Sequence, residues 1–254
     1  MPNAVMAHMV AFYPDAGGSF AAARALADGG ARYIEVQFPF SDPTADGPLI
    51  QVACRRALER GFKVRGGFEL VSRIAKAFCA PLFIMAYANT VFFHGVERFV
   101  EAAARCGARG VIVPDLPHDY DEGLYEAAAR GGIEAIPVVA PSTGDERLEA
   151  VLSCRSGFVY AALRAGITGA YTEIGSRNTA FLERVARHGK KILAGFGVSE
   201  RRQVEALAPH VHACVVGSAF VKAIAQAAAQ ASDGRGDEKE RIYRTVREKI
   251  DSLI

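Results

Sequence analysis

The sequence lacks the features that mark several large classes of protein. Its 30 lysines and arginines nearly balance 28 aspartates and glutamates, and the net charge is only +2. Such a chain has no electrostatic field strong enough to gather nucleic acid or an anionic membrane. No apolar run reaches about 18 residues, and no charged segment precedes an apolar core at the N-terminus. We therefore expect a cytoplasmic protein with no nucleic-acid partner and no membrane association.

Cysteine and histidine offer no recognisable metal or redox motif. The five cysteines are scattered and never form a C-x-x-C pair, which is typical of buried thiols in a reducing compartment. No H-x-x-x-H spacing is present, so we predict no metal site. No histidine falls at the carboxyl end of a predicted strand, and we assign none of them catalysis. The histidines are His8, His94, His118, His188, His210 and His212.

What the chain does contain is a regular alternation of eight short apolar runs with helical patterns, several of them stopped by glycine. This order predicts parallel strands with crossover helices, and 254 residues suit an eight-stranded parallel β/α (TIM) barrel. A doubly wound sheet is the competing fold, but no G-x-G-x-x-G follows the first run. We expect one barrel domain over residues 1–254, with a charged break at 231–240. The expected strands are 5–13, 33–38, 82–87, 110–114, 133–139, 157–161, 191–194 and 213–216; the expected helices are 20–27, 48–60, 68–77, 95–105, 119–130, 145–152, 178–188, 198–207, 218–229 and 241–254.

The segment IEVQFPFSDPTADGP, residues 34–48, carries three carboxylates in and after one apolar run. Glu35 lies inside the run, where an ionised side chain is costly unless it is paired or hydrated, and Asp42 and Asp46 follow in a proline-containing loop. A carboxyl fixed on a strand and a second on a loop that can close over a substrate suit acid–base catalysis. The alternative is a polar strand end followed by a solvated turn, and this segment alone does not separate the two.

Other polar residues fall where a parallel barrel has its active site, at or just beyond the carboxyl ends of the strands. Each also has a structural interpretation: the tyrosines as core aromatics, the aspartate as a turn residue and the arginine as a surface charge. These candidates are Tyr87, Asn89, Asp115, Tyr160 and Arg164.

Three late segments place glycines at strand ends: GITG at 166–169, GFGVS at 195–199 and VGSAF at 216–220. Glycine lets the backbone approach an anion, and a helix N-terminus offers unpaired N–H groups with a partial positive charge. Phosphate-binding barrels use the loops after strands seven and eight for this purpose. Any one segment could be a plain turn, but the three together predict a phosphate site.

With these residues laid out, the chain resembles the alpha subunit of tryptophan synthase. The resemblance is carried by IEVQFPFSDPTADGP, IMAYANTVF, VIVPDLP, YAALRAGITG, AGFGVS and VVGSAFV. It implies an eight-fold β/α barrel that cleaves indole-3-glycerol phosphate to indole and glyceraldehyde 3-phosphate, without a metal or cofactor of its own. It also implies an alpha2-beta2 complex, in which the beta subunit carries pyridoxal phosphate and receives the indole.

The resemblance also implies roles for individual residues. Glu35 would protonate indole C3 and take the proton of the glycerol hydroxyl, because a carboxyl in an apolar strand can hold and release a proton. Asp46 would accept the indole N–H as positive charge develops on the ring. Asp42 and Pro43 would face the beta subunit. The implied substrate-binding residues are Tyr87, Tyr160, Arg164, Thr168, Gly169, Gly197, Gly217 and Ser218.

Three individual residues depart from the usual family pattern. Gln37 and Phe12 stand where the family usually has glycine, and Leu163 replaces a small serine. We expect the Gln37 amide to reach into the pocket or to hydrogen-bond Glu35. Two other functions stay open: a stand-alone lyase that releases indole, and a weakly catalytic subunit that activates the beta chain.

Overall fold

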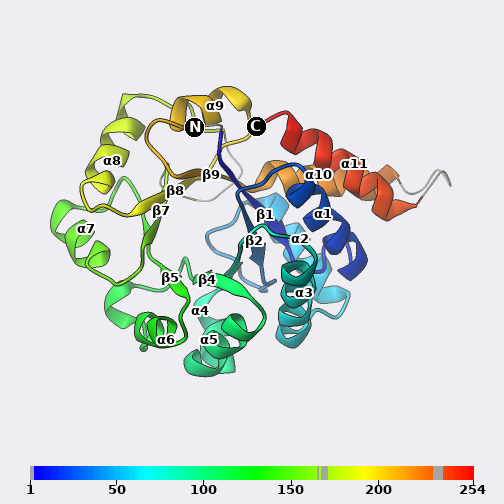
Figure 1. Ribbon diagram of the computed structural model, residues 1–254, viewed down its shortest axis with the longest axis horizontal. Coiled ribbons are helices and arrows are strands. Elements are labelled where there is room, and N and C mark those ends of the chain that lie inside the picture. The colour runs from blue at the N-terminus through cyan, green and yellow to red at the C-terminus, as the bar shows by residue number, and fades with distance from the viewer. Residues whose placement is uncertain (1–2, 165, 167–170, 231–236) are drawn as a thin grey trace.

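The computed structural model describes residues 3–164, 166, 171–230 and 237–254. Its strands pair in parallel in the order β5-β4-β3-β2-β1-β9-β8-β7-β6 (Figure 1). No helix in these ranges is long and apolar enough to cross a membrane. The strands are β1 (Val5–Val10), β2 (Tyr33–Gln37), β3 (Leu82–Met85), β4 (Ala108–Ile112), β5 (Glu134–Ile136), β6 (Val138–Val139), β7 (Phe158–Ala162), β8 (Lys191–Gly195) and β9 (Ala213–Val216). The helices are α1 (Ala16–Asp28), α2 (Pro48–Glu59), α3 (Val64–Ala77), α4 (Ala88–His94), α5 (Val96–Arg105), α6 (Leu124–Arg130), α7 (Asp145–Leu152), α8 (Ser176–Ala186), α9 (Arg201–Leu207), α10 (Ser218–Ala229) and α11 (Glu238–Asp251).

The sheet closes on itself because its two edge strands belong to one segment of chain. β5 pairs with β4, β6 pairs with β7, and only Pro137 separates β5 from β6. Proline has no N–H to donate, but the Pro137 carbonyl still accepts a hydrogen bond from the Tyr160 N–H at 2.8 Å. With this interrupted segment counted as one strand, the eight-stranded barrel predicted from the sequence is confirmed.

Alternation along each strand separates the barrel interior from the layer beneath the helices. In β2, Ile34 belongs to the large apolar layer that the helices cover, whereas Tyr33 belongs to a smaller cluster inside the barrel. Glu35 and Gln37 lie two and four residues after Tyr33, so both side chains face the barrel interior. The same alternation turns His8 of β1 inward, and three polar side chains therefore meet in the barrel.

Phe12 ends β1 earlier than the sequence predicts, at Val10. Its backbone is left-handed, with φ 63°, which a strand cannot continue. The ring packs edge-on against Phe62 with centroids 5.4 Å apart, and a β-carbon on Gly66 would lie 3.0 Å from it. This packing holds Phe12 in a conformation that glycine adopts more readily.

Two further segments differ from the prediction for local reasons. The helix expected over residues 119–130 is a short 3-10 turn at His118–Tyr120 followed by α6, because Glu122 and Gly123 have left-handed backbones, with φ 50° and 81°. Residues 88–94 were not expected to be helical, but they form α4. The Asp115 carboxylate accepts the Ala88 N–H at 2.8 Å and so fixes the start of this helix.

Helix α11 packs on α1 and α10, as its position beside both in Figure 1 shows. Its buried residues Ile242, Val246 and Ile250 recur every four positions and form one apolar stripe. The helix begins at Glu238, before the predicted residue 241, because the Asp237 side chain accepts the Lys239 N–H at 3.1 Å as an N-terminal cap.

Candidate active site

A pocket opens among the carboxyl ends of the strands, with a volume of about 590 Å³ including its mouth. The barrel fold places ligands at this face. The pocket brings together six residues that the sequence singled out, from both early and late strands. These are Glu35, Asp46, Tyr160, Gly197, Gly217 and Ser218, and His8 and Phe196 join them in the wall.

Glu35 lies on the pocket wall with only 4% of its surface exposed. Its Oε2 is 3.1 Å from Nδ1 of His8, which is directly opposite in the register of β1 and β2. Burial lowers the pKa of His8, but the Glu35 carboxylate raises it, and the net pKa lies above its ordinary value of 6.5. The sequence assigned His8 no role, yet it is the charge partner of Glu35.

Asp46 is also buried, and two side chains hold it. Gln37 Nε2 and the Tyr87 hydroxyl donate hydrogen bonds to the same oxygen, Oδ2, at 2.7 and 2.8 Å. Burial raises the pKa of the Asp46 carboxyl, while His8 and the two hydrogen bonds act in the opposite direction and only partly offset it. The carboxyl is thus fixed in one orientation toward the pocket.

Gln37 donates its hydrogen bond to Asp46, so the hydrogen bond expected to Glu35 is not formed. Besides its bond to Asp46, its amide nitrogen lies 3.5 Å from the Cys54 sulfur. The Gln51 side chain donates to the Asp46 carbonyl at 2.8 Å, so two amides hold the aspartate from different sides.

Tyr87 contacts Asp46 through its hydroxyl group. Its hydroxyl donates to the Asp46 carboxylate and accepts the Ala45 N–H at 3.1 Å, while its ring stacks on Phe40 with centroids 5.4 Å apart. These contacts fasten the acidic loop to the start of α4, just beyond β3. In this structure Tyr87 supports the loop that carries Asp46.

Tyr160 extends from β7 toward the end of β8. A β-carbon at Gly195 would come within 2.7 Å of its hydroxyl oxygen, so a glycine is required at this strand end. Phe196, the next residue, has a left-handed backbone with φ 82° and packs edge-on against the Tyr160 ring. The sequence singled out the GFG glycines but missed Phe196 as part of the pocket wall.

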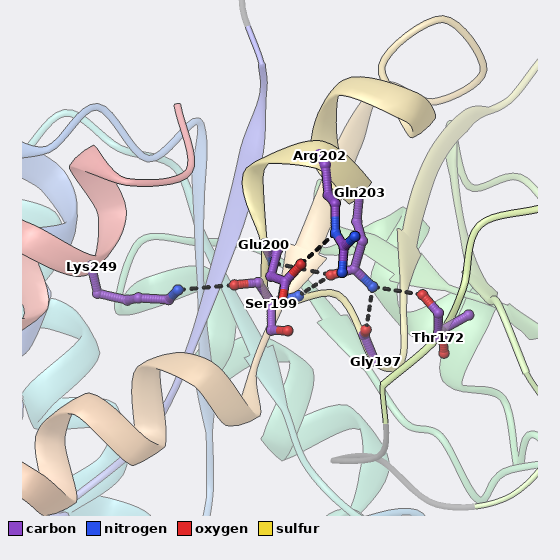
Figure 2. Close-up of polar contacts among 7 residues, drawn as sticks. All are labelled: Thr172, Gly197, Ser199, Glu200, Arg202, Gln203 and Lys249. Carbon is purple, nitrogen blue, oxygen red and sulfur yellow. Dashed lines mark hydrogen bonds and ion pairs between the residues drawn. The ribbon is translucent and has the colours of Figure 1, made fainter.

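The loop after β8 is held by one buried side chain amide, that of Gln203 (Figure 2). Its oxygen accepts the N–H groups of Ser199 and Glu200 at 2.8 and 3.0 Å. Its nitrogen donates to the carbonyls of Thr172 and Gly197 at 2.6 and 2.7 Å. The sequence missed Gln203, because a glutamine in a helical pattern carries no motif.

Two further contacts tie this loop to its surroundings. The Thr172 hydroxyl donates to the Phe196 carbonyl at 2.8 Å. Lys249 of α11 donates to the Ser199 carbonyl at 2.9 Å (Figure 2). Gly217 and Ser218 lie at the start of α10, where a helix of 12 residues offers free N–H groups and a partial positive charge. The late strands therefore present backbone groups to the pocket.

The remaining predicted residues are absent from the pocket wall or fall outside the described residues. Arg164 follows β7 and is half-buried, whereas Thr168 and Gly169 fall outside the described ranges. Asp42 is exposed and accepts a hydrogen bond from the Ser41 hydroxyl at 2.6 Å, next to the buried Pro43. No contact in the described residues tests the expected partner surface.

Leu163 and Asp115 both have structural contacts. The Leu163 side chain is buried and its carbonyl accepts the Asn178 amide at 2.7 Å. Asp115 accepts the Ala88 N–H, as described above, and so has a structural contact at the start of α4 rather than only the turn role expected for it. Asn89 is exposed on α4.

Comparison with known proteins identifies the family. A family model described as tryptophan synthase alpha chain matches residues 2–250. The tryptophan synthase alpha chain of Helicobacter hepaticus is 39% identical over 233 residues, covering 89% of this chain and 87% of that protein. That of Methanosarcina acetivorans is 38% identical over 249 residues, covering 98% and 89%. The crystal structure of the tryptophan synthase A-subunit from Pyrococcus furiosus is similar with a TM-score of 0.86 and 33% identity, covering 99% of this chain and 97% of that one. On its sequence, its fold and the residues gathered in its pocket, this chain belongs to the tryptophan synthase alpha chain family.

Proposed function

We propose that this protein is a lyase that cleaves indole-3-glycerol phosphate into indole and glyceraldehyde 3-phosphate, as the alpha subunit of a tryptophan synthase. The observation that carries the proposal is that two buried carboxyl groups, those of Glu35 and Asp46, line one pocket in a barrel of this family. The reaction needs two such groups, one for proton transfer at indole C3 and one to accept the indole N–H.

Glu35 carries the proton transfers. It protonates indole C3, which leaves positive charge on the ring, and then takes the proton of the hydroxyl next to the breaking bond. The electron pair of that carbon–carbon bond returns to the ring, and an aldehyde forms. One proton is given and one is taken, so the carboxyl returns to its initial state.

Asp46 stabilises the charge that develops on the ring. Its carboxylate accepts the indole N–H, and because Gln37 and Tyr87 already hold its Oδ2, little reorganisation is needed as the charge forms. In the proposed pose, Tyr160 lies beside the ring, and Gly197, Gly217 and Ser218 receive the phosphate at the opposite end. Arg164, Thr168 and Gly169 complete the substrate contacts.

We infer a beta-subunit partner from the related structures. One Pyrococcus furiosus structure is of the tryptophan synthase complex, and another concerns mutual activation of the tryptophan synthase a2b2 complex. By analogy, this chain would bind a beta subunit through the loop that contains Asp42 and Pro43. Pyridoxal phosphate would belong to that partner, and residues 1–254 would act as one cytoplasmic barrel domain.

The proposal is tested by measuring indole release from indole-3-glycerol phosphate with the purified chain, alone and with a tryptophan synthase beta subunit. We expect slow release alone and a strong increase with the partner. Fast release that the partner does not change would instead indicate a stand-alone lyase. Activation of the beta subunit without any indole release would contradict the lyase proposal and indicate an activating subunit.

A further inference from the structure

His8 lies in the pocket, but the reaction described above gives it no task. Only 5% of its surface is exposed, its Nδ1 contacts Glu35, and its Nε2 is buried without a hydrogen-bond partner among the described residues. A buried, incompletely paired imidazole is costly unless it serves a purpose. We propose that His8 is a positioning residue for Glu35, and that the two form one ion pair that holds the proton used in the cleavage. This inference rests on the proposed function.

The contact between the two residues is built into the sheet. His8 and Glu35 are paired in the register of β1 and β2, and both face the barrel interior. Neighbouring strands hold side chains that share a face at short range. The 3.1 Å distance between Nδ1 and Oε2 therefore does not depend on a loop, and Glu35 has a fixed orientation before substrate arrives.

The surroundings of His8 favour a positive charge. Glu35 faces it from β2 and Asp46 faces it from the loop before α2, while Tyr160 from β7 is the other titratable group of the pocket wall. On the side of β9 and α10, its neighbours Gly217 and Ser218 carry no charge. Burial lowers the pKa of His8, but the Glu35 and Asp46 carboxyl groups raise it, and the net pKa lies above 6.5.

The pair changes the pH range of the reaction. A proton shared by two groups is lost at a pH at least as high as it would be from either group alone, because it can rest on either one. The pair gives this proton to indole C3, and Glu35 then recovers a proton from the glycerol hydroxyl. Turnover is therefore expected to fall only when the pH rises through the raised pKa of His8.

Two substitutions separate the orientation of Glu35 by His8 from the titration of His8 itself. His8→Gln keeps a hydrogen-bond donor for Glu35 but removes the titrating group, whereas His8→Phe removes both. We expect the His8→Gln variant to retain turnover within about tenfold of the parent at low pH, and its alkaline limb of kcat against pH to move to lower pH. His8→Phe is expected to lose more turnover at every pH. An alkaline limb unchanged in both variants would overturn the proposal.

The ion pair is also tested without substrate, by measuring the pKa of His8 in an NMR titration of the histidine ring protons. We expect His8 in the full chain to titrate above 6.5, and Glu35→Gln to lower that pKa because burial then dominates. His212 is a matched control at the opposite end of the barrel: burial, Arg32 and Lys191 lower its pKa, and Glu35→Gln should leave it unchanged.

The two measurements test the proposed function and the ion pair separately. If indole-3-glycerol phosphate is not cleaved, the proposed function is wrong, and the NMR titration still shows whether the ion pair exists. If cleavage occurs but Glu35→Gln leaves the pKa of His8 in place, the pair does not exist and this inference is wrong.

Discussion

The two ends of the pocket are built on different principles. At the acidic end, charged and hydrogen-bonding side chains hold one another: His8 contacts Glu35, and Gln37 and Tyr87 bind Asp46. At the other end, one neutral amide, that of Gln203, holds backbone groups. The first arrangement depends on protonation and the second on geometry. We therefore expect changes at the acidic end to alter turnover and pH dependence, and changes at the other end to alter substrate binding.

The largest effect is expected at Glu35. Glu35→Gln keeps the size of the side chain but cannot carry a proton, so turnover should fall by about a hundred- to ten-thousandfold while KM changes little. The measurement is steady-state release of indole. A variant with near-parental turnover would show that Glu35 does not transfer the proton, and the comparison between the two ends would then fail.

Asp46→Asn should separate activity from stability. Loss of the charge is expected to reduce turnover by about a hundredfold or more. Burial raises the pKa of Asp46 above 3.8, so the folded state binds its proton more tightly than the unfolded state, and the ionised carboxyl destabilises the fold at neutral pH. The variant should therefore be more stable than the parent in urea at pH 7.

The stability advantage of Asp46→Asn should also disappear in acid. Below the unfolded pKa the parent carboxyl is protonated in both states, and it no longer costs stability. Urea midpoints measured between pH 3 and pH 7 give this difference. A gap that widens toward low pH would contradict the expected direction of the pKa change.

Gln203→Leu tests the opposite end. It removes an amide that makes four hydrogen bonds to backbone groups, one of them to the buried Thr172 carbonyl, at a cost of about 1–3 kcal/mol. We expect KM to rise about tenfold with no shift of the pH profile, since no titrating group is lost. Gln226→Leu on the exposed face of α10 is the matched control. A shifted pH profile in Gln203→Leu would break the comparison.

The smallest effect is expected from Lys249→Met. This change removes one hydrogen bond, to the Ser199 carbonyl, worth about 0.5–1.5 kcal/mol. KM should rise by about twofold, and Lys222→Met, an exposed lysine of α10, should leave KM unchanged. Equal values of KM for both variants would show that α11 does not support the loop.

The barrel could be predicted because its periodicity is local. Short apolar runs that alternate with helices leave few topologies open, and α7 and α10 were predicted with their observed ends. The division at Pro137 was not predicted, since the apolar run continues on both sides of it. Strand ends set by a single left-handed residue, such as Phe12, likewise carry no signal in the apolar pattern.

The candidate site could be predicted only where a residue follows a strand or lies in a recognisable motif. Glu35 and Asp46 met that condition. His8 did not, because its importance comes from the register between β1 and β2, which the sequence does not state. Gln203 was missed for a similar reason: its partners, Thr172 and Gly197, become neighbours only when the late strands pair.

The contact between Lys249 and the loop after β8 has a consequence for biosynthesis. Lys249 lies 50 positions after Ser199, beyond every strand of the barrel. On the ribosome, the strands of the barrel are therefore complete before this last tie to the loop can form. Full affinity for substrate in the nascent chain should therefore trail barrel formation, and it should be reached only when α11 has emerged from the exit tunnel.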